Sequence, residues 1–78
     1  MQPTYKKTYY PDSEEITFYK ITGNLSVAVS KFSYNKTTEY SFFKVENTKL
    51  ITSMMVDSTK EEYESAYKEM IEFMEKNK

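Results

Sequence analysis

The C-terminal segment 58–77 carries the pattern that most constrains the fold, an amphipathic helix with one apolar stripe. Its apolar side chains recur at helical spacing on one side: Tyr63, Ala66, Tyr67, Met70, Ile71, Phe73 and Met74. Ser58 and Glu61 match the S-x-x-E capping box, with Ser58 as the N-cap. We therefore predict a helix over 58–77. Because such a stripe is stable only when it is buried, the rest of the chain must supply a surface for it.

The segment 14–56 has the pattern of β-strands. Runs rich in β-branched and aromatic residues indicate strands at 15–22, 25–33, 38–45 and 50–56, with polar connections between them. Gly23 and Asn24 tolerate the positive φ that a tight hairpin needs. Short connections join strands that pair, so these four form an antiparallel meander. The sequence thus predicts an α+β fold, a four-stranded meander packed on one C-terminal helix.

The first 13 residues hold both prolines, Pro3 and Pro11, and lack clear periodicity. We predict an extended N-terminal arm over 1–13, followed by the meander and the helix within a single domain, 1–78. Tyr5, Tyr9 and Tyr10 make this arm more aromatic than an ordinary disordered tail. We therefore expect it to lie against another part of the protein.

Both faces of the predicted sheet carry apolar residues, although one helix covers only one face. Leu50, Met54 and Val56 share a face with Phe43 and Val45, whereas Ile51 and Met55 share the other with Tyr40 and Phe42. The surface that includes Tyr40 and Phe42 then needs a cover. The arm or the curl of the sheet, a second copy of the chain, or a bound partner each satisfies this need. The residues leave these three alternatives open.

Strand 25–33 has an apolar row of Leu25, Val27 and Val29, which we assign to the core. The strand before it fits this row in two registers. A two-residue turn at 23–24 places Ile16 and Phe18 on the core side, together with Lys20. A three-residue turn places Tyr19 and Ile21 there instead.

The residue types present argue against catalysis. The chain has no His and no Cys, so it lacks the commonest general base and the strongest nucleophile. It has one Gly, and no phosphate-binding loop or metal-binding motif occurs. We predict a non-enzymatic protein without cofactor or metal. The lack of Cys, of an apolar leader and of any apolar run of about 18 residues predicts a cytoplasmic location away from membranes.

Nucleic-acid binding is one alternative function. Single-strand binders stack bases on sheet aromatics and track the backbone with basic residues. Tyr40 and Phe42 would serve as such platforms, with Lys31, Lys36 and Lys44 nearby. However, the net charge is −1, and all 11 basic residues are Lys. The absence of Arg removes the planar guanidinium that reads guanine and phosphate best.

Binding to a protein or nucleoprotein partner fits the composition best. Tyr is favoured at interfaces because it offers a large contact area, few rotatable bonds and a polar tip. The candidate contact residues are therefore Tyr5, Tyr9, Tyr10 and Tyr34, together with Tyr40, Phe42 and the three lysines of the nucleic-acid alternative. A homodimeric structural domain is a second alternative, in which the spare sheet face is its own interface.

The length, the meander followed by the capped helix 58–78, the Tyr-, Lys- and Glu-rich surface and the lack of catalytic residues resemble a broad class of proteins. These are the small accessory proteins of phages and mobile elements, including anti-CRISPR and other anti-defence inhibitors. The resemblance implies a stoichiometric inhibitor of a host defence nuclease or nucleoprotein complex. No residue role follows from it, because such inhibitors share no common motif.

Overall fold

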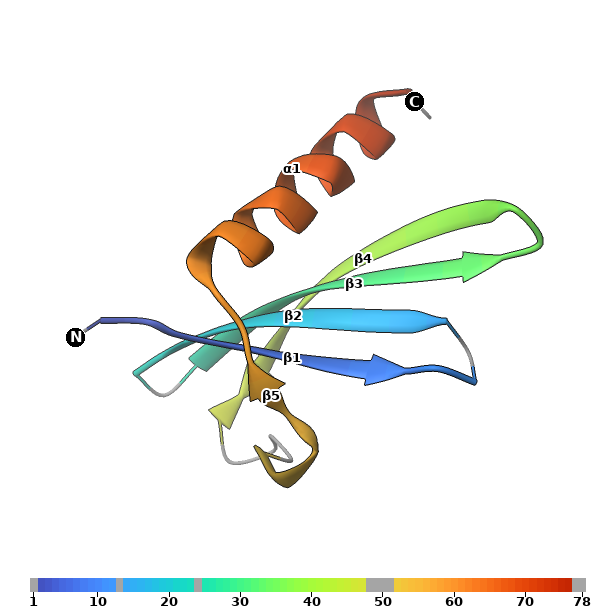
Figure 1. The fold of residues 1–78 in the computed structure, drawn as a ribbon. Coiled ribbons are helices and arrows are strands. Elements are labelled where there is room, and N and C mark those ends of the chain that lie inside the picture. The colour runs from blue at the N-terminus through green and yellow to red at the C-terminus, as the bar shows by residue number, and fades with distance from the viewer. Residues whose placement is uncertain (1, 13, 24, 48–51, 77–78) are drawn as a thin grey trace.

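The structure is a computed structural model of the chain that describes residues 2–12, 14–23, 25–47 and 52–76. It has the predicted α+β architecture, an antiparallel sheet packed on one C-terminal helix (Figure 1). The strands are β1 (Thr4–Tyr10), β2 (Glu15–Thr22), β3 (Leu25–Tyr34), β4 (Thr37–Glu46) and the short β5 (Val56–Asp57). Their order across the sheet is β4-β3-β2-β1-β5. The helix α1 spans Lys60–Lys76 and lies across one face of this sheet.

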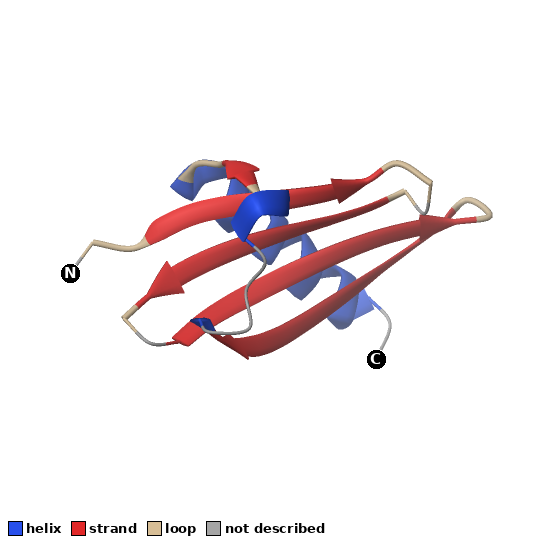
Figure 2. Ribbon diagram, turned by 90° about the horizontal axis from the view of Figure 1, so that it is seen from below, coloured by secondary structure: helices blue, strands red, loops and turns tan. Residues whose placement is uncertain are grey.

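Two predicted boundaries of the sheet are wrong. The expected arm contains β1, an inner strand that pairs with β2 along its length and with β5 on its other side. The expected strand 50–56 lies partly outside the described residues, and its next part, Thr52–Met54, is a 3₁₀ helix, η2. The meander is therefore β1–β4. The chain then crosses to the far edge of the sheet, where β5 pairs with β1, and η2 lies on the face opposite α1 (Figures 1 and 2).

The register of β2 and β3 follows the two-residue turn. Phe18 pairs with Val29 and Lys20 with Val27, so Ile16 and Phe18 are on the core side. Gly23 has the positive φ, +48°, that this turn requires. In the next hairpin, Asn35 and Lys36 form the turn between Tyr34 and Thr37. Of the two registers that the sequence left open, the structure adopts the first.

The helix covers the face that carries Val27 and Val29. Val29 is fully buried and packs against Tyr63, Ala66 and Met70 of α1, with half-buried side chains around this cluster from Tyr5, Phe18, Val27 and Tyr40. Because Val29 pairs with Phe42, both Tyr40 and Phe42 are on this covered face. Phe43 and Val45 therefore lie on the other side. The prediction that Tyr40 and Phe42 belong to the surface left by the helix is wrong.

The helix begins one residue later than predicted. The Oγ1 atom of Thr59, rather than that of Ser58, accepts a hydrogen bond from the backbone N–H of Glu62, at 3.1 Å. Thr59 is thus the N-cap of the helix, and Glu62 occupies the third position after it. The backbone N–H of Ser58 donates instead to the carbonyl of Tyr5, at 3.1 Å, which joins the start of the helix to β1.

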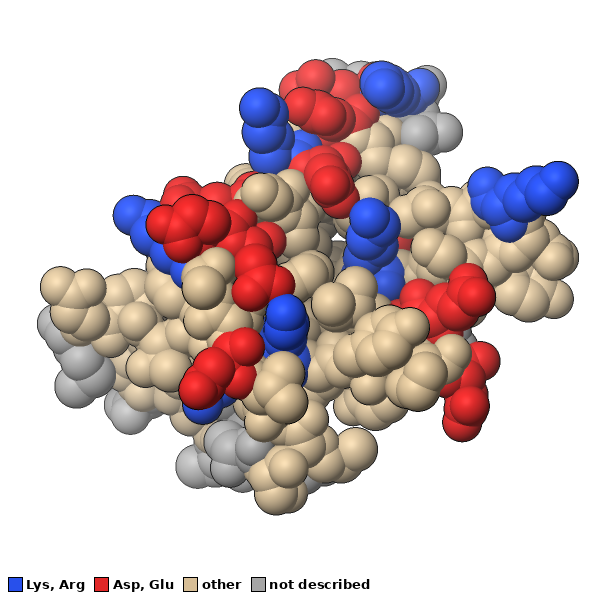
Figure 3. All heavy atoms as spheres, in the orientation of Figure 1, with Lys and Arg blue, Asp and Glu red and all other residues tan. Residues whose placement is uncertain are grey.

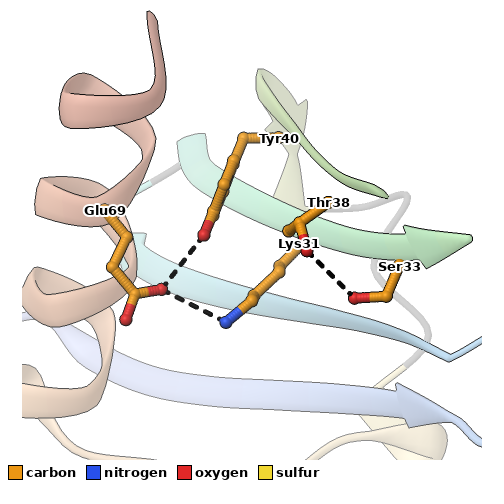
Figure 4. Close-up of polar contacts among 5 residues, drawn as sticks. All are labelled: Lys31, Ser33, Thr38, Tyr40 and Glu69. Carbon is orange, nitrogen blue, oxygen red and sulfur yellow. Dashed lines mark hydrogen bonds and ion pairs between the residues drawn. The ribbon is translucent and has the colours of Figure 1, made fainter. Parts of the chain in front are cut away.

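Ion pairs fix the helix and β5 to the sheet. Lys7 of β1 pairs with Glu62 at 2.7 Å, and Lys6 pairs with Asp57 of β5. The hydrogen bond from Lys7 holds the pKa of Glu62 below its usual range, and the bond from Lys6 does the same to the pKa of Asp57. Lys31 of β3 pairs with Glu69 at 3.3 Å, and the hydroxyl of Tyr40 donates to the same carboxylate (Figure 4).

The first prediction concerns the core. Met70 is 2% exposed, whereas Met54 of η2 is 54% exposed. Met70→Ala should lower the free energy of unfolding by about 2–5 kcal/mol, because it leaves a cavity beneath the helix. Met54→Ala, the matched control, should change it by less than about 0.5 kcal/mol. Urea unfolding followed by circular dichroism measures both. Equal effects would mean that α1 does not sit on Val29 as described.

The second prediction concerns acid stability. A carboxyl group whose pKa is lowered by folding stabilises the fold above its unfolded pKa, about 4, and this contribution is lost as the pH falls through the lower folded value. Lys7→Gln removes the partner of Glu62, so its melting temperature should fall less between pH 5 and pH 3 than that of the wild type. Lys36→Gln makes the same charge change in a hairpin turn, and its melting temperature should fall as much as that of the wild type. An equal fall in melting temperature for all three proteins would contradict the ion pair.

Candidate functional site

The sheet face opposite α1 has a floor of small, buried residues. Thr8, Thr17, Ser26, Ala28 and Ser30 are each at most 7% exposed. The hydroxyl of Thr17 donates to Ser30 at 3.3 Å, and Ser30 donates to Glu15 at 3.0 Å. These bonds satisfy polar groups that would otherwise be costly to bury. By the sheet register, larger side chains border this floor: Tyr19 and Phe43 flank Ala28 in its own row, and Tyr10 and Phe32 lie in the row next to Thr8, Thr17 and Ser30.

The side chain of Asn47 anchors the end of β4 on this face. Ser26 donates to its Oδ1 atom, and its Nδ2 group donates to the carbonyl of Gly23. These bonds join the end of β4 to the turn between β2 and β3. Because η2 lies on the same face, this end of the sheet is partly covered (Figure 2). The other end, where the β3–β4 hairpin projects, is more open.

The open end carries an aromatic tip, which we define as Phe32, Tyr34 and Asn35. The rings of Phe32 and Tyr34 stack, with centroids 6.3 Å apart and planes 14° from parallel. Tyr34 is 66% exposed, the largest exposed fraction among the described large apolar side chains. The two rings lie on the same face because they are two residues apart in β3.

Two shallow hollows border the aromatic tip. One, of about 300 Å³, is also lined by Thr37 and Glu39 of β4. The other, of about 470 Å³, reaches Pro11, Asp12 and Glu14 in the turn between β1 and β2. The backbone N–H of Ser33 donates to the carbonyl of Glu14, which brings this turn against β3. A partner that contacts Tyr34 therefore also meets β4 and the turn between β1 and β2.

The surroundings of the tip are acidic. Asp12, Glu14 and Glu39 are exposed and Glu15 is half-buried, whereas Lys36 is the lysine of the hairpin turn itself. Figure 3 shows carboxylates gathered along the helix and again at the hairpin end of the sheet. An aromatic pair within carboxylates favours a basic or apolar protein surface over the phosphate backbone of a nucleic acid, because like charges repel.

The backbone of the hairpin turn is strained. Asn35 and Lys36 both have positive φ, +49° and +66°, as a type I′ turn requires. Asn tolerates this conformation. In Lys36 the Cβ atom clashes with the backbone, which costs about 1 kcal/mol of conformational free energy. Such strain is retained only where the rest of the structure enforces it, here the strand pairing of Tyr34 with Thr37 that closes the turn.

The structure separates the candidate residues from the sequence into three regions. Tyr34 and Lys36 are at the hairpin end, and Tyr10 closes β1 on the face opposite α1. Tyr9, which is 62% exposed, stands on the helix side at the end of β1. The remaining candidates, Tyr5, Lys31, Tyr40, Phe42 and Lys44, line the face beneath or beside α1. No single site contains them all.

The residues beneath the helix make internal contacts. Tyr5 lies 5.9 Å from Tyr63, Tyr40 lies 5.2 Å from Phe73, and Phe42 lies 5.7 Å from Tyr67, measured between ring centroids. Burial raises the pKa of the Tyr40 hydroxyl. Open grooves of about 440 and 420 Å³ flank α1, and ion-paired Lys31 and Glu69 line the larger one. These aromatics therefore serve packing in this structure.

Sequence analysis missed the stack of Phe32 on Tyr34 and the carboxylates around it. Phe32 and Tyr34 are two residues apart at the end of a strand that leads into a two-residue turn. This spacing is the sequence signal that indicates an aromatic pair on one face. The described residues contain no group of three or more acidic, His or Cys side chains placed to hold a metal ion. No described helix is long and apolar enough to cross a membrane.

Comparison with known proteins adds no assignment: no family model, curated protein or solved structure matches this chain.

The third prediction concerns the strained turn. Lys36→Gly should raise the free energy of unfolding by about 1 kcal/mol, because Gly adopts a positive φ without the Cβ clash. Lys36→Ala keeps the Cβ atom and removes the same charge, so it should bring no such gain. Thermal and urea unfolding compare the two. If Ala stabilises the protein as much as Gly, then charge rather than backbone strain determines the effect.

Proposed function

We propose that the protein is a non-enzymatic binding protein that acts stoichiometrically on a basic surface of a protein or nucleoprotein partner. The observation that supports this most is the aromatic tip, where a stacked Phe32–Tyr34 pair with Tyr34 66% exposed stands among carboxylates. Exposed Tyr on a rigid element is typical of residues that dominate binding energy. Its stack on Phe32 and its place in the paired hairpin order it before binding, which reduces the entropy lost on association.

A basic nucleic-acid-binding cleft is the kind of surface that fits this chemistry. The carboxylates of Asp12, Glu14 and Glu39 would meet its cationic side chains, and the aromatic pair would contact its apolar parts. A protein with this action would block a nuclease by occupying the place of its substrate. The sequence resemblance to anti-defence inhibitors favours the same proposal.

The single-strand nucleic-acid alternative gains no specific support from the arrangement. Its expected platforms, Tyr40 and Phe42, pack against Phe73 and Tyr67 of the helix. Lys31, its expected phosphate contact, pairs with Glu69. We therefore place protein binding first and use nucleic acid as a competing outcome of the test.

The fourth prediction tests the tip as a contact surface. Immobilised wild type, Tyr34→Ala and Tyr9→Ala are each incubated with a nuclease-treated bacterial lysate, and the retained proteins are quantified. Tyr34→Ala should weaken capture by about 30-fold, the effect of losing a residue worth about 2 kcal/mol. Tyr9→Ala removes an equally exposed Tyr from the other face and should retain the same proteins as the wild type.

The same experiment separates the alternatives. Capture that persists in Tyr34→Ala but is lost in Tyr9→Ala would contradict the proposed surface. Retention that requires intact nucleic acid, with an affinity for a fluorescent single-stranded oligonucleotide that falls steeply with salt, would favour the nucleic-acid alternative. Circular dichroism of each variant checks that both substitutions leave the fold unchanged.

A further inference from the structure

The outer edge of β4 is a second surface that the proposed function does not use. β4 is ten residues long and stands last in the sheet, and no described strand pairs with its outer side. It contains no Pro, and Phe42 and Phe43 are 41% and 37% exposed. Proteins usually protect a long edge strand with proline, bulges or inward-pointing charges, because its free N–H and C=O groups pair readily with another strand. On the helix face of β4 such charges occur only at its C-terminal end, Lys44 and Glu46, which leaves Thr38, Tyr40 and Phe42 without them.

The geometry of the hairpin turn determines which backbone N–H and C=O groups of β4 point away from β3. A two-residue turn is closed by a hydrogen-bonded pair, here Tyr34 and Thr37, and the bonding direction alternates along the strand from that pair. The even-numbered residues of β4 therefore direct their N–H and C=O groups away from β3. Their side chains, including those of Tyr40, Phe42 and Lys44, stand on the helix face.

The helix presents apolar side chains above the same edge. Tyr67 contacts Phe42 of β4, with their centroids 5.7 Å apart and the rings edge to face. Ile71 and Met74 come four and seven residues after Tyr67, so all three side chains lie on the same side of the helix. The three are 41%, 37% and 47% exposed. A free strand edge and an exposed apolar helix flank thus adjoin.

We propose that the protein forms a symmetric homodimer in which the β4 strands of two copies pair antiparallel, with Phe42 on the twofold axis. This register places Tyr40 opposite Lys44 and Thr38 opposite Glu46 of the second copy, so no like charges face each other. The two helix flanks approach across the same axis. The inference does not rest on the proposed function.

Two properties favour a second copy over a foreign strand. The edge is self-complementary, as a twofold interface requires. In the described part of the chain, the cluster buried beneath the helix has four members, Val29, Tyr63, Ala66 and Met70, so burial of the helix flank between two copies adds stability that the monomer lacks. Pairing of β4 also makes the faces opposite α1 continuous, which places two aromatic tips on one surface.

The fifth prediction is the test, sedimentation of the full chain over about 1–300 µM, a range that reveals a concentration-dependent association. The wild type should sediment with twice the 9.3 kDa mass of the chain. Lys44→Pro removes one outward N–H and should yield a monomer, because Pro is tolerated at an edge but cannot donate to a second strand. Lys44→Ala, which keeps the N–H, should remain a dimer.

A second pair of variants keeps the test decisive if Lys44→Pro fails to fold. Ile71→Lys places a charge on the helix flank above β4 and should give a folded monomer. Ser65→Lys makes the same charge change on the other side of α1, beside the groove of Ile16 and Phe18, and should stay dimeric. A wild type that is monomeric at every concentration, or a dimer that Ile71→Lys leaves intact, would overturn the proposal.

Discussion

The alternation of side chains along β3 is the constraint on which the rest of the structure depends. Val27 and Val29 point to one face, and Ser26, Ala28 and Ser30 point to the other, so the apolar stripe of α1 gains most by covering the valines. Pairing then brings Phe18 and Phe42 to the same side as Val29. The small residues, with Thr8 and Thr17, form a tightly packed floor on the other face. One strand thus determines which face of the sheet the helix covers.

Much of this fold follows from local patterns in the sequence, and the errors have physical causes. The helix and the strands β2, β3 and β4 are predictable because each has one clear periodicity. β1 is not, because its segment places Lys7 beneath the helix, where Glu62 neutralises it, and so breaks the alternation of apolar and polar residues. The segment 50–56 is apolar enough for a long strand, but its chain must cross to the opposite edge of the sheet, and only Val56–Asp57 pair there.

The candidate site was predictable only in part. Tyr34 beside a turn signal indicates an exposed aromatic residue, and it lies at the open end of the sheet. The carboxylates of Asp12 and Glu14 reach the same place because β1 pairs with β2, a long-range arrangement that no local pattern reveals. Tyr40 and Phe42 were misplaced because the choice of covered face depends on the register of four strands. Burial against the helix then gives them a packing role that composition alone could not distinguish from a binding role.

The central claim is that α1 covers the valine face of β3 and leaves the Ala28 face to carry the aromatic tip. Proton–proton nuclear Overhauser effects test it most directly, since they report contacts within about 5 Å, the separation of packed side chains. We predict contacts from the methyl groups of Val29 to Ala66 and Met70, and none from the methyl group of Ala28 to any residue of α1. Contacts between Ala28 and the helix, with none from Val29, would reverse the two faces and contradict the account.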